Sequence, residues 1–231
     1  MPSSNTASYE VIYNTLKKQI TYLELIPGTL VSEIETAKEF SVSRTPVRDA
    51  FKALVNEGLL EVKPHVGTFV SLIDINEISD ILYIREIMEK AILRDLSASF
   101  NQSQEFKLRH ILHNQENLIE NNSLSPQDFA TEFARSDNEF HQALFTLAGK
   151  ENLITYFQMI SAQYERFRTF LNFEDKSTVK TLYLQHVKLL DCIKNKDMNE
   201  LDTILTHHIY DGFNSKANLI YEYPNYFRPL R

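Results

Sequence analysis

The sequence has very little cysteine and no long apolar run. Cys192 is its one cysteine, so no disulfide can form within the chain. The apolar neighbours of Cys192, such as Leu189 and Ile193, predict a buried thiol and not a nucleophile. No apolar run reaches the roughly 18 residues that span a bilayer, and residues 1–10 lack the basic start and apolar core of a signal peptide. We therefore expect a protein of the reducing cytoplasm without a membrane segment.

Positive charge is also scarce. The chain holds 24 Lys and Arg against 31 Asp and Glu, which gives a formal net charge of -7. Proteins that bind nucleic acid neutralise phosphates with clustered cations, and this balance excludes a chain that is basic throughout. Any contact with nucleic acid must come from a small basic surface on an acidic body.

Glycine is rare in the second part of the chain, where only Gly149 and Gly212 occur beyond residue 73. The apolar pattern there is helical, and no strand signal of comparable quality appears. The pattern breaks near residues 101, 123–126, 149, 172–175 and 195–197. These breaks predict an antiparallel six-helix bundle over residues 74–231, with the tail from Tyr221 packed as an irregular strap.

The first 73 residues show a different order of elements. Ser43 suits the N-cap of a helix that Gly58 ends. The expected helices and strands are, in chain order, residues 9–23, 33–40, 43–57, 59–62 and 68–72. A helix, a helix-turn-helix and a hairpin in this order form a winged helix-turn-helix. The predicted fold is therefore mainly α, with a winged helix-turn-helix domain at 1–73 and an all-helical domain at 74–231.

The third predicted helix divides into a basic and an apolar face. Arg44, Arg48 and Lys52 are spaced at i, i+4 and i+8, so they form one stripe, and an apolar face that includes Val47 and Leu54 lies opposite. A recognition helix in the major groove needs this division, because Arg donates to base edges while the other face packs. A solvated basic face on an ordinary surface helix is the alternative. The surrounding helix-turn-helix and hairpin favour the hypothesis that this helix binds DNA. The other residues expected to face DNA are Ser43, Thr45 and, in the hairpin tip, His65.

These residues resemble the GntR family of regulators over roughly residues 9–72. The resemblance rests on Ile26-Pro27-Gly28, on residues 43–50 (SRTPVRDA), on residues 57–60 (EGLL) and on residues 67–70 (GTFV). It implies that Arg44 and Arg48 contact bases or phosphates and that the wing near His65 and Gly67 enters or lines the minor groove. The chain departs from the family pattern at Ile34, where an Arg is frequent, and at Val66, where the wing tip is often polar, so the operator preference stays open.

Four side chains of the predicted bundle are expected to face its interior. Asp137 and His141 share the buried face of one helix, and His186 and His208 each interrupt an apolar stripe. Three imidazoles and one carboxylate suit a divalent transition metal with open positions, with zinc, nickel or manganese favoured over calcium. Each histidine alone is more simply a core imidazole, so a metal-free network of histidines is the alternative. His207 lies on a polar face, and we expect it to be exposed.

This pattern resembles the FCD effector domain of FadR-like GntR regulators over roughly residues 74–218. In that domain an Asp-x-x-x-His pair and two later histidines surround a metal, and Asp137, His141, His186 and His208 match. The resemblance implies a small organic acid as effector. Arg85 lies on an inward stripe and is suited to clamp an anion, and Arg168 is a second candidate. Alternatively, either arginine pairs with a buried acid or lies at an interface.

The sequence therefore predicts a ligand-responsive transcription repressor. We expect a homodimer that binds a palindromic, double-stranded operator, a divalent metal and a small carboxylate. The rival hypothesis is a metalloenzyme that uses the same centre. An enzyme needs a further acid or base beside the metal, and the helical pattern indicates no inward Glu or Asp other than Asp137. We therefore predict that the protein is not an enzyme.

Overall fold

The computed structural model describes residues 4–172, 176–215 and 218–229. Its contacts divide the chain into two compact units. Residues 79–158 and 168–218 form the second unit, and Met1–Ile78, Met159–Phe167 and Leu219–Arg231 form the first. The predicted domains, 1–73 and 74–231, divide the chain once, whereas two later segments of the chain fold with the N-terminal unit.

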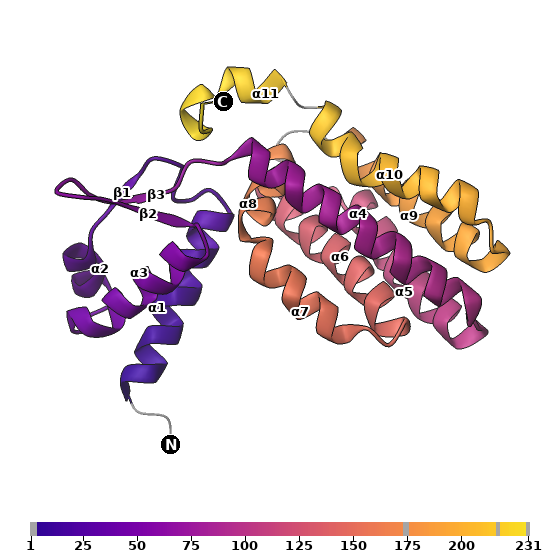
Figure 1. Ribbon diagram of the computed structural model, residues 1–231, viewed down its shortest axis with the longest axis horizontal. Coiled ribbons are helices and arrows are strands. Elements are labelled where there is room, and N and C mark those ends of the chain that lie inside the picture. The colour runs from indigo at the N-terminus through magenta and orange to yellow at the C-terminus, as the bar shows by residue number, and fades with distance from the viewer. Residues whose placement is uncertain (1–3, 173–175, 216–217, 230–231) are drawn as a thin grey trace. The chain divides into compact units, whose positions relative to one another are not determined.

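Residues 4–70 of the first unit form three helices and a small sheet in the order of a winged helix-turn-helix, which confirms the predicted fold (Figure 1). The antiparallel sheet has the strand order β1-β3-β2. Strand β1 was not predicted, because two residues are too few to show an alternating pattern. The elements are α1 (Ser4–Thr21), β1 (Leu30–Val31), α2 (Glu33–Glu39), α3 (Arg44–Asn56), β2 (Leu60–Lys63) and β3 (Gly67–Val70).

Helix α3 begins and ends where the sequence predicts. Ser43 occupies the N-cap with extended backbone, although its side chain makes no capping hydrogen bond. Gly58 follows the helix with φ of +70°, a conformation that glycine adopts without strain. The predicted apolar face is buried, with Val47 and Leu54 both at 0% exposure. Burying one such side chain contributes roughly 1.5 to 3 kcal/mol, so this face fixes the helix to its unit and leaves the opposite face outward.

The later part of the chain is helical, as predicted, but has more helices than the six expected. The segment that follows Gly149 is interrupted at Ser161, where the sequence has neither Gly nor Pro to signal a break. The predicted break at 172–175 falls largely on residues 173–175, outside the described residues. The helices are α4 (Ile75–Ala98), α5 (Gln102–Glu120), α6 (Pro126–Leu147), α7 (Glu151–Ile160), α8 (Ala162–Asn172), α9 (Lys176–Asn195), α10 (Met198–Ser215) and α11 (Asn218–Glu222).

In the second unit the long helices run side by side (Figure 1). Helix α5 packs against α6 and α9, and α9 packs against α10. Cys192 on α9 is buried, as predicted, and burial raises the pKa of its thiol to about 11. No helix in the described part of the chain is long and apolar enough to cross a membrane.

The C-terminal tail is more regular than the strap that we predicted. It contains α11 and a short 3-10 helix at Pro224–Tyr226. Beyond these, Phe227 forms a parallel bridge with Ile73, and the Arg228 amide donates to the Ile73 carbonyl over 2.8 Å. The tail therefore packs within the first unit, on the segment that follows the wing.

Candidate metal centre and DNA-reading helix

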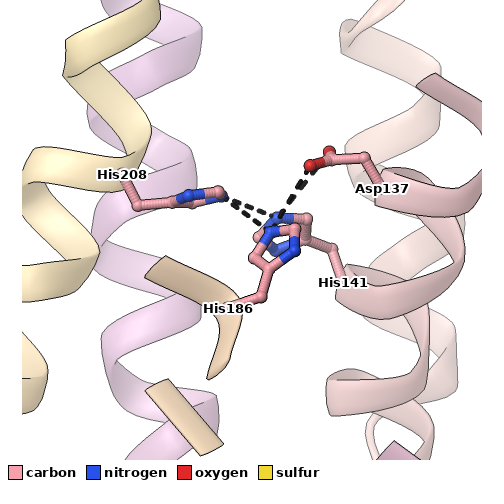
Figure 2. Close-up of side chains that lie close together, drawn as sticks. All are labelled: Asp137, His141, His186 and His208. Carbon is pink, nitrogen blue, oxygen red and sulfur yellow. Dashed lines mark hydrogen bonds and ion pairs between the residues drawn. The ribbon is translucent and has the colours of Figure 1, made fainter. Parts of the chain in front are cut away.

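The structure brings together the four side chains that the sequence singled out as metal ligands. Asp137 and His141 project from α6, His186 from α9 and His208 from α10, and their side chains converge (Figure 2). One ligand atom from each lies within 4.8 Å of the others, and all four residues are buried. The long helices thus carry a polar cluster into an apolar core, where unpaired polar groups are costly.

The spacing of the ligand atoms fits a transition metal. The Nε2 atom of His208 lies 3.0 Å from that of His141 and 3.2 Å from that of His186. The Asp137 Oδ1 atom lies 3.4 Å from His186 Nε2. Metal bonds of 2.0 to 2.1 Å in a tetrahedral site place ligand atoms about 3.3 Å apart. The cluster could therefore hold a metal after small adjustments of its side chains.

Each histidine has a partner on the ring nitrogen that faces away from the cluster. His141 Nδ1 lies 2.8 Å from Glu89 Oε2, and His186 Nδ1 lies 3.0 Å from Gln115 Oε1. His208 Nδ1 lies 3.1 Å from Gln185 Oε1. All three partner atoms are oxygens that accept hydrogen bonds.

The side-chain amides of Gln115 and Gln185 are oriented by hydrogen bonds to neighbouring acceptors. Gln115 Nε2 donates to the carbonyl oxygen of Ser136 over 3.0 Å, and Gln185 Nε2 donates to Asp211 Oδ2 over 2.9 Å. Each glutamine must therefore turn its oxygen toward its histidine. Such outer partners set the tautomer and ring orientation of metal-bound histidines.

It follows that every Nδ1 donates a hydrogen bond and every Nε2 carries a lone pair. Burial lowers the pKa of His186 to about 4 and also lowers the pKa values of His141 and His208, which favours the neutral form of each ring, with a single proton. The Nε2 lone pair of His208 then faces those of His141 and His186 at 3.0 and 3.2 Å. A bound cation would turn this unfavourable contact into ligation.

The prediction that Asp137 is the one inward acid is wrong. Glu89 on α4 is 2% exposed, and its carboxylate binds both His141 and the guanidinium of Arg85, whose Nε donates to Glu89 Oε1 over 2.6 Å. The sequence carried a signal for it, because Glu89 lies one turn after Arg85 on the stripe that contains Ile78 and Leu82. The argument against an enzyme from a missing acid therefore fails, although both oxygens of Glu89 are engaged.

The two candidate effector-binding arginines pair with acids of the cluster. Arg85 is buried on Glu89, and Arg168 donates to Asp137 Oδ2 and to Asn138 Oδ1. Burial alone would raise the pKa of Asp137, but the neighbouring charges together, with Arg168 contributing most, outweigh burial and lower that pKa. The structure thus agrees with the alternative that these arginines pair with buried acids. His207 lies outside the cluster with its side chain 66% exposed, as predicted.

The predicted DNA-reading residues lie on an exposed face of the first unit. Arg44 and Arg48 have side chains 55% and 54% exposed, and Lys52 is 69% exposed. Ser43 and Thr45 are exposed beside them. In the wing, His65 is exposed with φ of +61°. Gly67 has φ of +150°, a conformation that side chains rarely adopt, so this turn favours glycine.

An acidic residue that sequence reasoning missed lies beside this basic face. Glu33, at the start of α2, accepts a hydrogen bond from Arg44 over 3.0 Å, and its Oε2 lies 3.5 Å from Arg48 Nε. We predict that Glu33→Gln tightens binding to nonspecific DNA by about two- to fivefold at low salt, because an exposed ion pair of 0 to 1 kcal/mol no longer competes with phosphate. Fluorescence anisotropy with a random duplex measures this, and an unchanged or weaker affinity would contradict it.

Two regions of the chain match known protein families. Residues 8–70 match the family described as bacterial regulatory proteins, gntR family, and residues 80–211 match the FCD domain. The HTH-type transcriptional repressor RspR of Escherichia coli K12 is 28% identical over 216 residues, which cover 94% of this chain and 92% of that protein.

Two further proteins extend the comparison. A transcriptional regulator from an unstable DNA locus of Streptomyces ambofaciens is 30% identical over 94% of this chain and 88% of its own length. The solved structure of McbR/YncC from E. coli aligns with a TM-score of 0.68 at 18% identity, covering 93% of this chain and 97% of that one. At this identity the alignment shows a shared fold. The chain belongs to the GntR family of bacterial regulatory proteins, and it is a transcription regulator with a C-terminal FCD domain, not an enzyme.

Proposed function

We propose that the protein is a repressor whose FCD domain binds a divalent metal and, on that metal, a small carboxylate. The observation that carries the metal proposal is the convergence of three neutral imidazoles with their Nε2 lone pairs inward. Asp137, His141, His186 and His208 would hold the ion. Nitrogen and carboxylate ligands favour zinc, nickel or manganese. The metal would supply a Lewis-acid position to which an anion can bind.

The charges around the cluster support an anionic effector. Arg85 is paired with Glu89 and Arg168 with Asp137. A divalent metal would add positive charge to this buried cluster, which is costly without counter-charge. A carboxylate would supply negative charge and could take a hydrogen bond from either guanidinium.

Operator binding tests this function. Fragments selected from genomic DNA would supply the operator, and a panel of small carboxylic acids would be added to the metal-loaded protein on that duplex. We expect at least one acid to weaken operator binding by about 5- to 150-fold, the usual range of coupling between two sites. Operator affinity that no acid changes while the metal stays bound would contradict the proposed induction.

We also propose that the protein binds its operator as a homodimer, through contacts that include α7. None of the residues of α7 is buried, although most are apolar, and Tyr156 and Met159 are 64% and 69% exposed. Exposed apolar helices mark protein contacts. A second copy is the expected occupant, because an acidic chain associates with itself most easily through a surface of low charge, and Glu151 is the one charged residue of α7.

Sedimentation equilibrium tests the dimer. Tyr156→Glu should raise the dimer dissociation constant by about tenfold or more, since it places two charges in an apolar contact. Tyr221→Glu is the matched control, because Tyr221 is 77% exposed on α11. If Tyr156→Glu and the wild type have equal dimer dissociation constants, α7 is not part of the dimer interface.

A further inference from the structure

The helix-turn-helix of the first unit carries as many acidic as basic side chains. Residues 33–56, which include α2 and α3, hold four Lys or Arg and four Asp or Glu. A segment without net positive charge has little general attraction for the phosphate backbone, which supplies most nonspecific binding to DNA. These residues are Lys38, Arg44, Arg48 and Lys52 against Glu33, Glu35, Glu39 and Asp49.

Glu33 is the acid that contacts the DNA-reading arginines. Its Oε2 atom accepts a hydrogen bond from Arg44 Nη2 over 3.0 Å and lies 3.5 Å from Arg48 Nε. Because the two arginines are one helical turn apart on α3, a single carboxylate oxygen spans both. The side chain of Glu33 is 27% exposed, against 55% and 54% for Arg44 and Arg48. The acid is thus more sheltered from solvent than the guanidinium groups that it contacts.

The fold of the helix-turn-helix fixes the backbone that carries Glu33. Ser32 caps α2, and its hydroxyl accepts a hydrogen bond from the amide of Glu35 over 3.4 Å. Helix α2 packs against α3, and Thr36 and Ala37 of α2 are buried. The partners of Glu33 lie on a helix whose opposite face is also buried. The contact therefore joins two elements that are each held in place by packing.

Glu33 meets Arg48 without occupying the end of its guanidinium. The carboxylate lies beside Nε, and no acceptor among the described residues bonds to the two terminal nitrogens of Arg48. Two such nitrogens can donate together to O6 and N7 of guanine. An arginine that is already held in one orientation loses less rotamer freedom when it binds. Glu33 is therefore compatible with base reading by Arg48.

Contact with phosphate alone has the opposite requirement. A phosphate that binds Arg44 must compete with Glu33 for the Nη2 donor, and it then lies near a carboxylate of the same sign of charge. The acid therefore opposes sequence-independent contacts of α3 with the DNA backbone.

We propose that Glu33 determines the specificity of operator recognition, because it positions Arg48 for base contact and disfavours contact of Arg44 with phosphate. This role of Glu33 depends on the proposed repressor reading its operator through α3. Glu33 is a positioning residue, since it acts through the two arginines. Loss of its charge should therefore affect operator and random DNA differently, which simple competition between charges would not do.

Fluorescence anisotropy of the full-length protein tests this role. The selected operator and a random duplex are titrated at the same salt concentration. Glu33→Gln keeps the shape of the side chain and removes its charge. We expect the ratio of operator to random-duplex affinity to fall by about fivefold, the upper end of what an exposed ion pair contributes to an equilibrium constant. Tighter binding of both duplexes at an unchanged ratio would overturn the proposal.

Glu35→Gln is the matched control. Glu35 lies on the same helix, its side chain is 70% exposed, and it pairs with Lys38 over 2.9 Å. This variant loses the same charge, so it should strengthen binding to both duplexes alike and keep the wild-type ratio. An equal fall of the ratio in Glu33→Gln and Glu35→Gln would show that net charge alone is responsible, and the positioning role would be wrong.

A double variant locates the effect in Arg48. Operators altered at single positions measure the base preference. In an Arg48→Ala background, Glu33→Gln should no longer relax the preference at any base pair, because the side chain that it positions is gone. If Glu33→Gln still relaxes the preference in this background, it does not act through Arg48 and the proposal fails.

Arg48→Ala also separates this role from operator reading itself. If Arg48→Ala weakens operator binding while Glu33→Gln leaves the affinity ratio unchanged, α3 reads DNA and the role of Glu33 alone is wrong. If Arg48→Ala binds the operator as the wild type does, Arg48 does not read the operator and the role of Glu33 fails with it.

Discussion

His186→Gln is expected to lower the affinity of the protein for Zn²⁺ by about 100-fold or more. Loss of an outer partner of a metal-bound histidine typically costs 10- to 100-fold, and His186 is itself a proposed ligand whose Nε2 lies 3.2 Å from that of His208. Glutamine keeps an amide that can bond to Gln115, so the change removes the ligand nitrogen while leaving a polar group in the core. Competition against a chromogenic chelator measures the affinity.

His207→Gln is the matched control for this experiment. His207 neighbours His208 in the chain, but its side chain is 66% exposed and lies 3.6 Å from Asp211. It should bind Zn²⁺ like the wild type. Equal affinities of the two variants would show that the histidine cluster is a metal-free network, which is the alternative that the sequence left open.

Arg48→Ala is expected to weaken operator binding by about 1 to 3 kcal/mol, or roughly 5- to 150-fold, and to relax the preference at one base pair. Arg48 lies on the exposed face of α3, whose opposite face is fully packed. A bidentate contact of a guanidinium with guanine accounts for this size of effect. Titration of labelled operators that differ at single positions measures both the affinity and the preference.

Lys52→Ala separates base reading from charge. Lys52 lies one turn further along α3 and is 69% exposed, so we expect it to meet phosphate. Its loss should make the slope of log binding constant against log salt concentration shallower by about one unit, while the base preference stays intact. If both variants bind the operator as the wild type does, α3 is not the helix that reads DNA.

The sequence predicted the main parts of this architecture because each leaves a local pattern. The stripe of Arg44 and Arg48 opposite buried Val47 follows from helical periodicity, and the structure has this division. The metal cluster was predictable because His186 and His208 interrupt apolar stripes, and a polar residue on a buried face requires a partner. The structure brings these side chains together as expected.

Features that depend on contacts between distant segments were not predictable in this way. The inward stripe of Arg85 indicates that Glu89 is buried, but its contact with His141, from another helix, appears only in the folded unit. Glu33 and Arg44 lie on different helices, α2 and α3, and their contact appears only in the folded unit. The break at Ser161 has no glycine or proline. The contacts of Gln163 and Arg166 with Ser71 join segments more than 90 residues apart.

Metal analysis of protein purified without chelators tests the central claim most directly. We predict one zinc, nickel or manganese ion per chain, with X-ray absorption showing three imidazole nitrogens at about 2.0 to 2.2 Å. Protein that contains no metal and takes up none of these ions on incubation would contradict the claim, because the inward lone pairs of the three histidines would then need another explanation.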